Sequence, residues 1–600
     1  MHAAAINNVD GHAINKALQS SAPTKQECAN TRDDQDKYTF RLCSNRIHCS
    51  LLSFFNHSDE SHSIMAHLAA NTKPTAFDQD VAEEVALERL GYQQELKRDF
   101  SFIGMLAFSF SIVTSWSALS GVLAVGVESG GPPVMIWSWI GISAFSLAVA
   151  FSMAEMCSAY CLAGGQYSWC AVLAPKSIAR GFSYVCGWFM LIGIISMGAT
   201  NNFITANFVL GVANANNPDY VIERWHTVLV AYLVAALALS FNVFLPRLLD
   251  KISRGLIAWN ICAFLIIVVT ILATKTPLQS DRFVFVDFVN LSGFDKSYTA
   301  IVGLLQAAFG LCCYDAPAHM TEELKNARKE APRAIIYSVV IGAVTGFVFL
   351  IAACYCIGNI ETTAASTTGV PIIQIFLDST ASRAGASCLT VLLIVIGMGA
   401  SNALTAEGGR AVYAFARDHG LPFSSILSRV EKKKQIPVYA LCLTVLVQIA
   451  LNSIYFGTVT GFETVVSIAT EGFYVSYAMP LFARLLSLFT SDKAWRINGL
   501  YTLGRWSVPL NVLGLLYLVF TSITFNFPTL KPVTSENMNY TCAAVGAIML
   551  IALVTWLTTG WKHFKGPESG GVVIEGGEPR TPAITPERDV QSKLGEKTYH

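Results

Sequence analysis

The chain has 600 residues, of which 53% are hydrophobic and 14% are charged, and its formal net charge is zero. With a mean hydropathy of +0.47, this composition excludes a water-soluble globule with a polar exterior and indicates a polytopic membrane protein. The cysteines form no CxxC pair and have no histidine at zinc spacing, so small buried side chains and no metal site are expected.

The first 98 residues form a polar tail with no apolar run of the kind that opens a secretory signal. Lys97 and Arg98 end this tail beside the first apolar segment. Basic residues close to a spanning helix favour the cytoplasmic side. Residues 1–98 are therefore predicted to be a cytoplasmic and largely disordered tail.

Apolar runs of about 20 residues predict membrane-spanning helices. The sequence contains twelve, at residues 101–123, 134–156, 183–211, 226–245, 254–274, 299–321, 335–357, 386–409, 437–456, 462–486, 507–527 and 541–561. Residues 99–562 are thus expected to form an all-α, twelve-helix transporter domain. Residues 563–600 are rich in Gly, Pro and charge, which predicts a disordered cytoplasmic C-terminal tail.

Lysine and arginine are unevenly distributed between the loops on the two sides of the predicted bundle. With the first tail inside, the inner loops hold nineteen of them and the outer loops hold six. This asymmetry supports twelve helices with both termini in the cytoplasm.

The first predicted span carries a polar patch in its middle, which begins about eight residues after the span starts at residue 101. The patch consists of Ser109, Ser111, Thr114, Ser115 and Ser117. Irregular backbone at membrane depth is tolerated only where it is buried in protein or lines a wet cavity. The patch therefore predicts an interruption of the first helix beside a cavity.

The sixth predicted span is interrupted at a corresponding depth, in the stretch GLCCYDAPAHMTEELKNA. This stretch places Gly310, Asp315, Pro317 and His319 where an apolar helix should continue. Four predicted spans lie between the two broken ones, the first and the sixth, which therefore run in opposite directions. Paired interruptions of this kind point to a transporter's substrate site and predict a five-plus-five inverted repeat with two helices added.

Several motifs carry a resemblance to a known family. They are AEMCSAYCLAGGQYSW (154–169), YDAPAHMTEE (314–323), FARDHGLP (415–422) and FYVSYAMP (473–480). Together they resemble the fungal amino acid/choline transporter branch of the amino acid, polyamine and organocation superfamily, over about residues 85–562. One departure is Cys161, which stands where members of that branch usually carry proline.

The resemblance implies a leucine-transporter-type fold with broken helices 1 and 6. It also implies uptake of a small amine or amino acid, such as 4-aminobutyrate, choline, a polyamine or another amino acid, usually driven by protons. The expected location is the plasma membrane, with the vacuolar membrane as the alternative.

A broken helix exposes backbone N–H groups where it restarts and carbonyl groups where it stops. In the first helix, Ser111, Thr114 and Ser115 are predicted to bind a substrate carboxylate together with the free N–H groups. In the sixth, carbonyl groups from Gly310 to Cys313 are predicted to accept the substrate's ammonium group. The alternative is that these hydroxyls bond back to their own helix.

Asp315 has two possible roles. A carboxylate within a membrane span costs about 2.5 to 3.5 kcal/mol on insertion scales and therefore marks function by default. The order Asp315, Ala316, Pro317 is also a helix start with aspartate at the N-cap. His319, one turn further on, is expected to be a packed, hydrogen-bonded imidazole, with a proton relay as the alternative.

Other polar or aromatic residues inside predicted spans complete the substrate-binding prediction. Glu471 is interpreted as a counter-ion or a proton acceptor, or as a neutral side chain bonded to a neighbouring helix. Trp116 and Tyr314 flank the breaks and offer aromatic faces to an ammonium ion. Further polar candidates are Asn201, Asn202 and Asn402.

A second set of residues is predicted to have gating or structural roles. Glu155 and the pair Gly164 and Gly165 lie at the inner end of the second span, and His319 belongs to this set as well. Glu322 and Glu323 are predicted to join an inner salt-bridge network. The basic residues expected in that network are Lys325, Arg328 and Lys329.

Two further predictions concern a modification and the start of the working chain. Asn290, in the sequon NLS of an outer loop, is the expected glycosylation acceptor. Residues 1–64 show no helical period and no targeting signal, whereas the sequence from Met65 onward reads as an ordinary amino terminus. A chain beginning at Met65 is expected to insert and transport like the full chain.

The sequence therefore predicts a secondary active transporter that works by alternating access. Its expected partners are a small-molecule substrate, a coupling proton and the lipid bilayer, with no cofactor and no nucleic acid. A membrane-embedded enzyme is not expected, because the spans hold no GxSxG, HExxH or aspartyl pair. The alternatives are an amine sensor that does not transport and a polyamine carrier.

Overall fold

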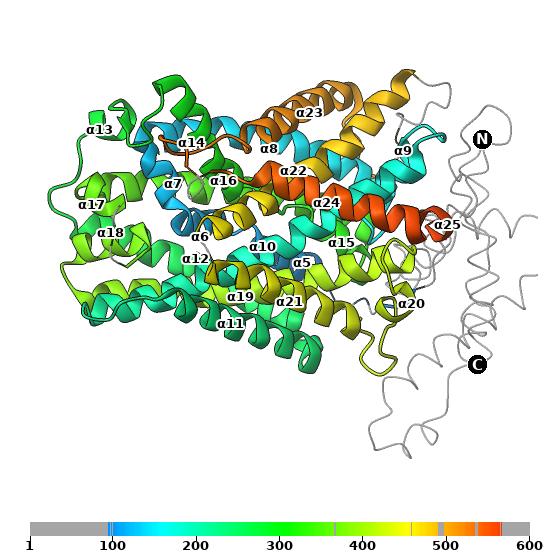
Figure 1. Ribbon diagram of the computed structural model, residues 1–600, viewed down its shortest axis with the longest axis horizontal. Coiled ribbons are helices and arrows are strands. Elements are labelled where there is room, and N and C mark those ends of the chain that lie inside the picture. The colour runs from blue at the N-terminus through cyan, green and yellow to red at the C-terminus, as the bar shows by residue number, and fades with distance from the viewer. Residues whose placement is uncertain are drawn as a thin grey trace, which may run out of the picture. The chain divides into compact units, whose positions relative to one another are not determined.

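The computed structural model describes residues 94–96, 98, 100–364, 366, 368–457, 459–489, 497, 499–534, 538–564 and 566. Helices and strands carry the labels of Figure 1. The predictions for residues 1–64, for a start at Met65 and for most of both tails fall outside these residues.

The described chain is almost entirely helical. The first half contains α5 (Phe102–Ile112), α6 (Ser115–Gly121), α7 (Leu123–Glu128), α8 (Gly131–Ala159), α9 (Gln166–Leu173), α10 (Ala179–Asn216), α11 (Arg224–Phe244), α12 (Leu249–Thr274), α13 (Asp281–Phe285), α14 (Lys296–Gly310) and α15 (Ala316–His319). The second half contains α16 (Ala327–Cys356), α17 (Ile360–Ala364), α18 (Pro371–Thr380), α19 (Arg383–Arg417), α20 (Ser424–Leu427), α21 (Val438–Ser453), α22 (Val459–Leu486), α23 (Ser507–Thr524), α24 (Thr541–Thr555) and α25 (Trp561–His563). Two-residue strands β1 (Ser129–Gly130) and β2 (Val289–Asn290) pair antiparallel. Short 3-10 turns lie at Pro246–Leu248, Thr321–Glu323, Ile454–Phe456, Ser487–Phe489 and Gly504–Trp506, and a π-helical turn at Trp556–Gly560.

Eleven helical segments in the described part of the chain are long and apolar enough to cross a membrane. The predicted span 299–321 is absent from this set, because it divides into α14, of 15 residues, and α15, of four. The chain is a multi-pass, all-α membrane protein. The twelve-helix count and the five-plus-five inverted repeat stay predictions.

Both predicted interruptions are present in the structure. The first helix stops at Ile112 and restarts at Ser115, with Val113 and Thr114 between the two pieces. The sixth stops at Gly310 and restarts at Ala316. Between them Cys313 has a φ of 63°, a left-handed conformation that side chains other than glycine rarely adopt.

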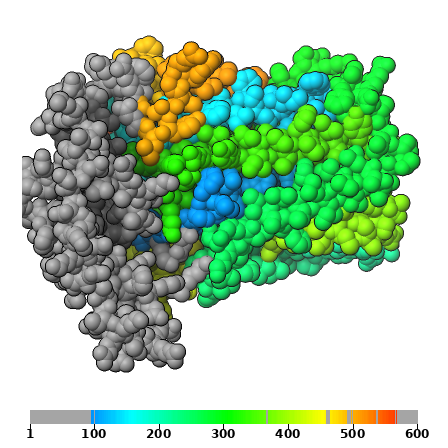
Figure 2. Space-filling model, turned by 180° about the vertical axis from the view of Figure 1, so that it is seen from behind, coloured from blue at the N-terminus to red at the C-terminus, as the bar shows by residue number. Residues whose placement is uncertain are grey.

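Helix α10 is central to the packing, where it contacts α9, α11, α19, α21 and α22. Its approach to α22 is close because glycines meet: a Cβ atom at Gly193 would lie 2.8 Å from the backbone nitrogen of Phe473. On the face shown in Figure 2, α16 lies beside α8 and α12, with α5 exposed next to it.

Large apolar side chains cover the outside of the bundle. In apolar 18-residue windows of α12 and of the helical segment Thr541–His563, which begins with α24, only 22% and 17% of the residues are buried within the protein. Leu265 and Val269 of α12 and Leu550 of α24 are more than half exposed. Such an apolar surface is compatible with lipid contact and not with water.

Candidate functional site

A cavity lies between the two helix interruptions. Its volume is about 40 Å³, enough for a few water molecules in this conformation. It is lined by Ile112, Val113, Thr114, Ser117, Ala118, Met197, Asn201, Ile204, Thr205, Phe208, Phe309, Gly310, Cys312, Cys313, Gly397 and Leu404. None of these side chains carries a formal charge.

Three of the predicted substrate-binding residues line this cavity: Thr114, Gly310 and Cys313. Two other polar lining residues, Ser117 and Asn201, were noted in the sequence as part of a polar patch or as a polar candidate. Thr205 and Cys312 were not singled out. The structure therefore brings both helix breaks to one cavity and adds α10 as a third wall.

Two of the predicted hydroxyl ligands bond to their own chain segment. The Ser111 Oγ donates to the carbonyl of Ala107 at 2.7 Å, and the Ser115 Oγ donates to the carbonyl of Val113 at 3.0 Å. Both residues are buried and neither lines the cavity. The back-bonding alternative therefore describes these two side chains.

The two aromatic candidates also lie outside the cavity lining. The Trp116 Nε1 donates to the Asn260 Oδ1 at 2.7 Å, and its ring packs on Phe264 with centroids 5.7 Å apart. Tyr314 is fully buried with its ring centroid 5.0 Å from that of Tyr477. Both rings are part of the helix packing in this conformation.

Asn402 and Glu471 lie apart from the cavity as well. The Asn402 Oδ1 accepts a hydrogen bond from the Asn242 Nδ2 at 2.9 Å, which joins α19 to α11. Glu471 is 5% exposed, faces Ser522 of α23, and has one carboxylate oxygen without a partner among the described residues. Neither side chain touches the space between the breaks.

Asp315 is the centre of a buried polar cluster just beyond the break. Its carboxylate accepts hydrogen bonds from the Gln166 Nε2 and the Tyr477 hydroxyl, each at 2.5 Å. It also lies 3.0 Å from the His319 Nε2. Asp315 stands at the N-cap position of α15, but its side chain makes no capping hydrogen bond. The carboxylate therefore joins α9, α15 and α22.

His319 is fully buried and has a partner at each ring nitrogen. The Nδ1 lies 3.2 Å from the carbonyl oxygen of Ala163, and the Nε2 faces Asp315. Gly165 lies against the same ring, because a Cβ at Gly165 would be 2.7 Å from the His319 Cε1. Gly164 is equally confined, since a Cβ there would be 2.0 Å from the Ser168 Oγ.

Replacing Gly165 by alanine is expected to destabilise the protein by about 1 to 3 kcal/mol, because its φ of 56° disfavours a side chain and the new methyl group would collide with His319. Thermal unfolding of detergent-solubilised protein measures the effect. Gly181→Ala is the control, because a Cβ there would meet nothing within 4 Å. Equal stability of the two variants would contradict the assigned contact.

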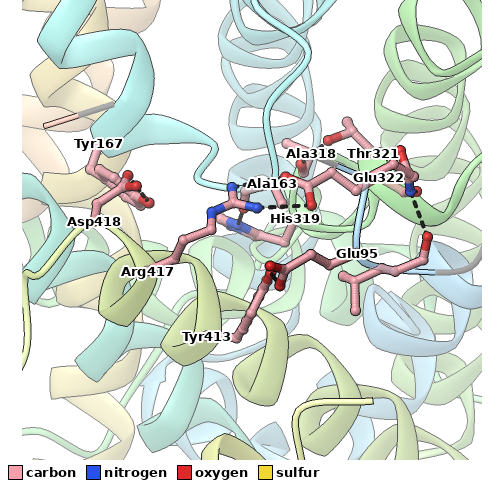
Figure 3. A network of polar contacts seen from close by, with 12 residues as sticks. Glu95, Ala163, Tyr167, Ala318, His319, Thr321, Glu322, Tyr413, Arg417 and Asp418 are labelled. Carbon is pink, nitrogen blue, oxygen red and sulfur yellow. Dashed lines mark hydrogen bonds and ion pairs between the residues drawn. The ribbon is translucent and has the colours of Figure 1, made fainter. Parts of the chain in front are cut away.

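Glu322 and Glu323 form the ion-pair network predicted for the inner side, but with different partners. The Arg417 guanidinium donates to the Glu322 carboxylate at 2.9 and 3.1 Å, as Figure 3 shows. The Arg410 guanidinium donates to Glu323 at 2.6 and 3.2 Å. We call the end of the bundle where these ion pairs lie the basic end. The basic-end network below consists of Glu322, Glu323, Arg410 and Arg417.

The sequence predicted that these two carboxylates pair with Lys325, Arg328 and Lys329. In the structure they pair with arginines of α19 instead. The reason is that the chain bends after the 3-10 turn at Thr321–Glu323, so these carboxylates face α19. The Lys325 backbone nitrogen instead donates to the carbonyl of Phe100 at 3.2 Å. Arg328 contacts the carbonyl of Ser158 at 3.4 Å.

Further polar contacts brace this end of the bundle. The Tyr413 hydroxyl donates to the Glu95 carboxylate at 2.6 Å, and the Tyr167 hydroxyl donates to Asp418 at 2.8 Å (Figure 3). The Gln94 Nε2 donates to the carbonyl of Glu322 at 2.8 Å. The segment before α5 is thus fixed to the network.

Glu155 has structural contacts at the inner end of α8. It accepts hydrogen bonds from the Arg484 guanidinium at 2.7 Å, the Ser507 hydroxyl at 2.6 Å and the Leu503 backbone nitrogen at 3.1 Å. Glu155 and Arg484 are both almost fully buried. This ion pair joins α8, α22 and α23 far from the cavity lining.

Asn290 is engaged in the fold of its loop. Its Nδ2 donates to the carbonyl of Phe294 at 2.6 Å, and its Oδ1 accepts from the backbone and hydroxyl of Ser292. The residue also pairs with Ser129 between β2 and β1. The nitrogen that would carry a glycan is therefore bonded within the loop in this structure.

One residue of this region escaped the sequence analysis. Glu407 of α19 is fully buried, and both carboxylate oxygens lack a hydrogen-bond partner in the part of the chain that the structure describes. A carboxylate oxygen of Glu407, a carboxylate oxygen of Asp315 and a ring nitrogen of His319 all lie within 4.8 Å of one another. An acidic residue inside the apolar span 386–409 was the available signal.

Residues 100–551 match the family described as amino acid permease. The chain belongs to the amino acid permease family. A relative from Macrophomina phaseolina, named as an amino acid/polyamine transporter, is 65% identical over 73% of this permease and 97% of the relative. The amino-acid permease BAT1 of Arabidopsis thaliana is 30% identical over 81% of this chain and 96% of its own length. The choline transporter of Saccharomyces cerevisiae is 30% identical over 79% and 83%, respectively.

These matches agree with the geometry of the bundle. The permease is a multi-pass membrane transporter, and its two interrupted helices meet at a cavity. The names of its relatives are those of transporters and permeases, which are typically not enzymes.

Proposed function

We propose that this permease is a proton-coupled secondary active transporter whose preferred substrates are small amino acids with no net charge, such as 4-aminobutyrate. The observation that carries the proposal is the cavity between the two helix breaks, whose walls are uncharged and mostly apolar, with polar side chains at Thr114, Ser117, Asn201 and Thr205. Such walls suit a zwitterion, because its opposite charges are met by backbone groups of opposite polarity.

The helix ends at the cavity provide these groups. Helix α6 begins at Ser115, and the N–H groups of a helix's first turn have no partner inside the helix. Helix α14 ends at Gly310, where carbonyl groups are left over. The carbonyls of Ala308 and Phe309 accept from the Tyr474 hydroxyl and the Cys312 thiol. The Gly310 carbonyl is the remaining candidate acceptor for an ammonium group. The Ser117 hydroxyl is the candidate side-chain donor to the carboxylate, because the Asn201 Nδ2 already donates to the Gly397 carbonyl and the Ser401 Oγ.

Choline and polyamines rank below amino acids for a physical reason. A quaternary ammonium ion is bound best on the face of a tryptophan. Trp116 is held by Asn260 away from the cavity, and the aromatic rings in the lining are those of Phe208 and Phe309. A polyamine brings two or more positive charges, and no carboxylate is among the lining residues. Polyamines and choline nevertheless belong in the test panel, because the Macrophomina phaseolina relative is named as an amino acid/polyamine transporter and the yeast relative as a choline transporter.

The expected result is uptake of labelled 4-aminobutyrate or a neutral α-amino acid by permease-deficient yeast, with putrescine uptake lower by at least about tenfold, a difference of about 1.4 kcal/mol. Expression of an empty vector is the control. Faster uptake of putrescine than of any neutral amino acid would overturn the substrate class. Binding of a labelled substrate without flux would indicate the sensor instead.

Proton coupling is proposed because buried carboxylates with unpartnered oxygens, Glu407 and Glu471, lie within the described spans. Transport is expected to follow an imposed pH gradient and to be independent of sodium. We place one gate of the pathway at the basic-end network, so alternating access requires these ion pairs to separate. The plasma membrane is the proposed location.

A further inference from the structure

Glu407 occupies an unusual position for a charged side chain. It is fully buried on α19, and neither carboxylate oxygen has a hydrogen-bond donor among the described residues. A carboxylate without donors is very unfavourable in a dry interior, whereas a protonated carboxyl group is not. The environment of Glu407 in this conformation therefore favours the neutral, protonated form.

The neighbouring carboxylate has the opposite environment. Asp315 accepts from Gln166 and Tyr477, and it lies beside His319. Asp315 therefore has three polar partners, whereas Glu407 has no hydrogen-bond partner among the described residues.

His319 has a hydrogen-bond partner at each ring nitrogen. Its Nδ1 faces a carbonyl oxygen of Ala163, which only accepts hydrogen bonds, so this nitrogen carries a proton. Its Nε2 faces the Asp315 carboxylate at 3.0 Å, and a hydrogen bond there requires a second proton between the two atoms. The pair His319 and Asp315 is thus neutral overall, and ionisation of Glu407 would leave the cluster with one uncompensated negative charge.

Other titratable groups near the cluster do not compensate this charge. The break contributes Cys312, Cys313 and Tyr314, α22 contributes Tyr477, and α19 contributes Arg410. The thiols and phenols are neutral donors or acceptors at physiological pH. Arg410, one turn from Glu407, is already bonded to both oxygens of Glu323.

We propose that Glu407 is the residue that binds and releases the coupling proton of this permease, with the His319 and Asp315 pair as its fixed electrostatic partner. The proposal rests on the proposed proton-coupled function. In the conformation seen here Glu407 is protonated. Opening of the basic end would bring water to Glu407, its Oε–H bond would break, and the proton would pass to that water.

The substrate cavity and the proton site share one short segment. Cys312 and Cys313 line the cavity, and Asp315 follows two residues later. A substrate bound at the break therefore contacts the same segment whose Asp315 lies next to Glu407. This connection gives a physical route by which substrate binding and protonation stabilise the same conformation.

The test uses full-length protein in proteoliposomes with labelled 4-aminobutyrate, or the best substrate of the uptake panel. Two rates are measured: accumulation driven by an imposed pH gradient, and counterflow exchange at equal pH on both sides. Glu407→Gln mimics the protonated residue, so exchange should stay within about twofold of the wild type while pH-driven accumulation falls at least tenfold. Glu330→Gln, in a surface pair with Arg333, is the matched control and should retain both.

The outcomes separate the inference from the proposed function. Loss of pH-driven accumulation in E407Q with exchange retained supports the inference. Accumulation by E407Q at the wild-type rate overturns it. The inference is also overturned if Glu471→Gln loses pH-driven accumulation while E407Q keeps it. A wild type that ignores the pH gradient overturns the proposed proton coupling itself. If E407Q does not insert, Glu407→Asp must keep pH-driven uptake with a shifted pH midpoint, and an unshifted midpoint would overturn the inference.

Discussion

Replacing Arg410 by alanine is expected to destabilise the folded permease by about 3 to 5 kcal/mol, because it would leave the buried Glu323 carboxylate without its partner. Arg410 and Glu323 side chains are only 4% and 10% exposed, and the guanidinium bonds to both carboxylate oxygens. The Arg410 Nη1 also donates to the carbonyl of Ala406 at 3.1 Å. The substitution thus removes three hydrogen bonds and a counter-charge together.

Surface labelling in yeast and thermal unfolding of the purified protein measure this effect. Arg333→Ala is the control, because Arg333 is 48% exposed where it pairs with Glu330 at 3.5 Å, and this pair is expected to contribute only about 0 to 1 kcal/mol. The double variant Glu323→Gln with Arg410→Met should recover most of the stability, since no buried charge remains unpaired. An R410A protein as stable as R333A would refute the assigned role of the pair.

The double variant also bears on the transport cycle. With both charges absent, the stabilisation of the closed basic end by this ion pair is lost. Access from that end should then increase, and net accumulation should fall even though the protein folds. Ion pairs that must break and re-form in each cycle differ in this respect from the pair of Glu155 and Arg484, which joins three helices away from the cavity.

The two helix interruptions were predictable from the sequence because their signals are local. Gly310, Asp315 and Pro317 stand within an otherwise apolar run, and a serine-rich patch stands within another. Such residues disrupt a spanning helix wherever the rest of the protein lies. The structure accordingly breaks the chain at 113–114 and between Gly310 and Ala316.

The orientation of side chains around those breaks was not predictable in the same way. Ser111, Ser115 and Trp116 all lie near the first break, yet their partners turn them away from the cavity. Thr205 lines the cavity from α10, about 90 residues along the chain. Which face of a nearly all-apolar helix meets a cavity depends on packing against helices that are distant in sequence.

The same reasoning explains the misassigned partners of Glu322 and Glu323. Sequence proximity favoured the lysines and arginine that follow, but the turn after α15 directs both carboxylates toward α19. Glu407 was not among the predicted site residues, although it lies inside the predicted span 386–409. Arg410, one turn later, was assigned to the basic inner loop that follows this span. In the structure the Arg410 guanidinium donates to the Glu323 carboxylate, and Glu407 has no hydrogen-bond partner among the described residues.

Replacing Cys313 by valine is expected to reduce substrate uptake by at least about tenfold at unchanged external pH. Cys313 has a φ of 63° at the break and lines the cavity. A β-branched residue in this left-handed conformation is strained by about 1 to 3 kcal/mol. Relief of that strain would rotate the segment that carries the Gly310 carbonyl on one side and Asp315 on the other.

Three variants separate strain from side-chain chemistry at this position. Cys313→Gly removes the strain and the thiol together, so uptake near the wild-type rate would show that the backbone conformation is what matters. Cys312→Val is the matched neighbour, because Cys312 also lines the cavity but is not among the residues with positive φ. Initial uptake rates, normalised to surface-labelled protein, should follow the order wild type, C313G, C312V and C313V. If C313V transported as well as C313G, the left-handed residue would have no part in shaping the substrate site.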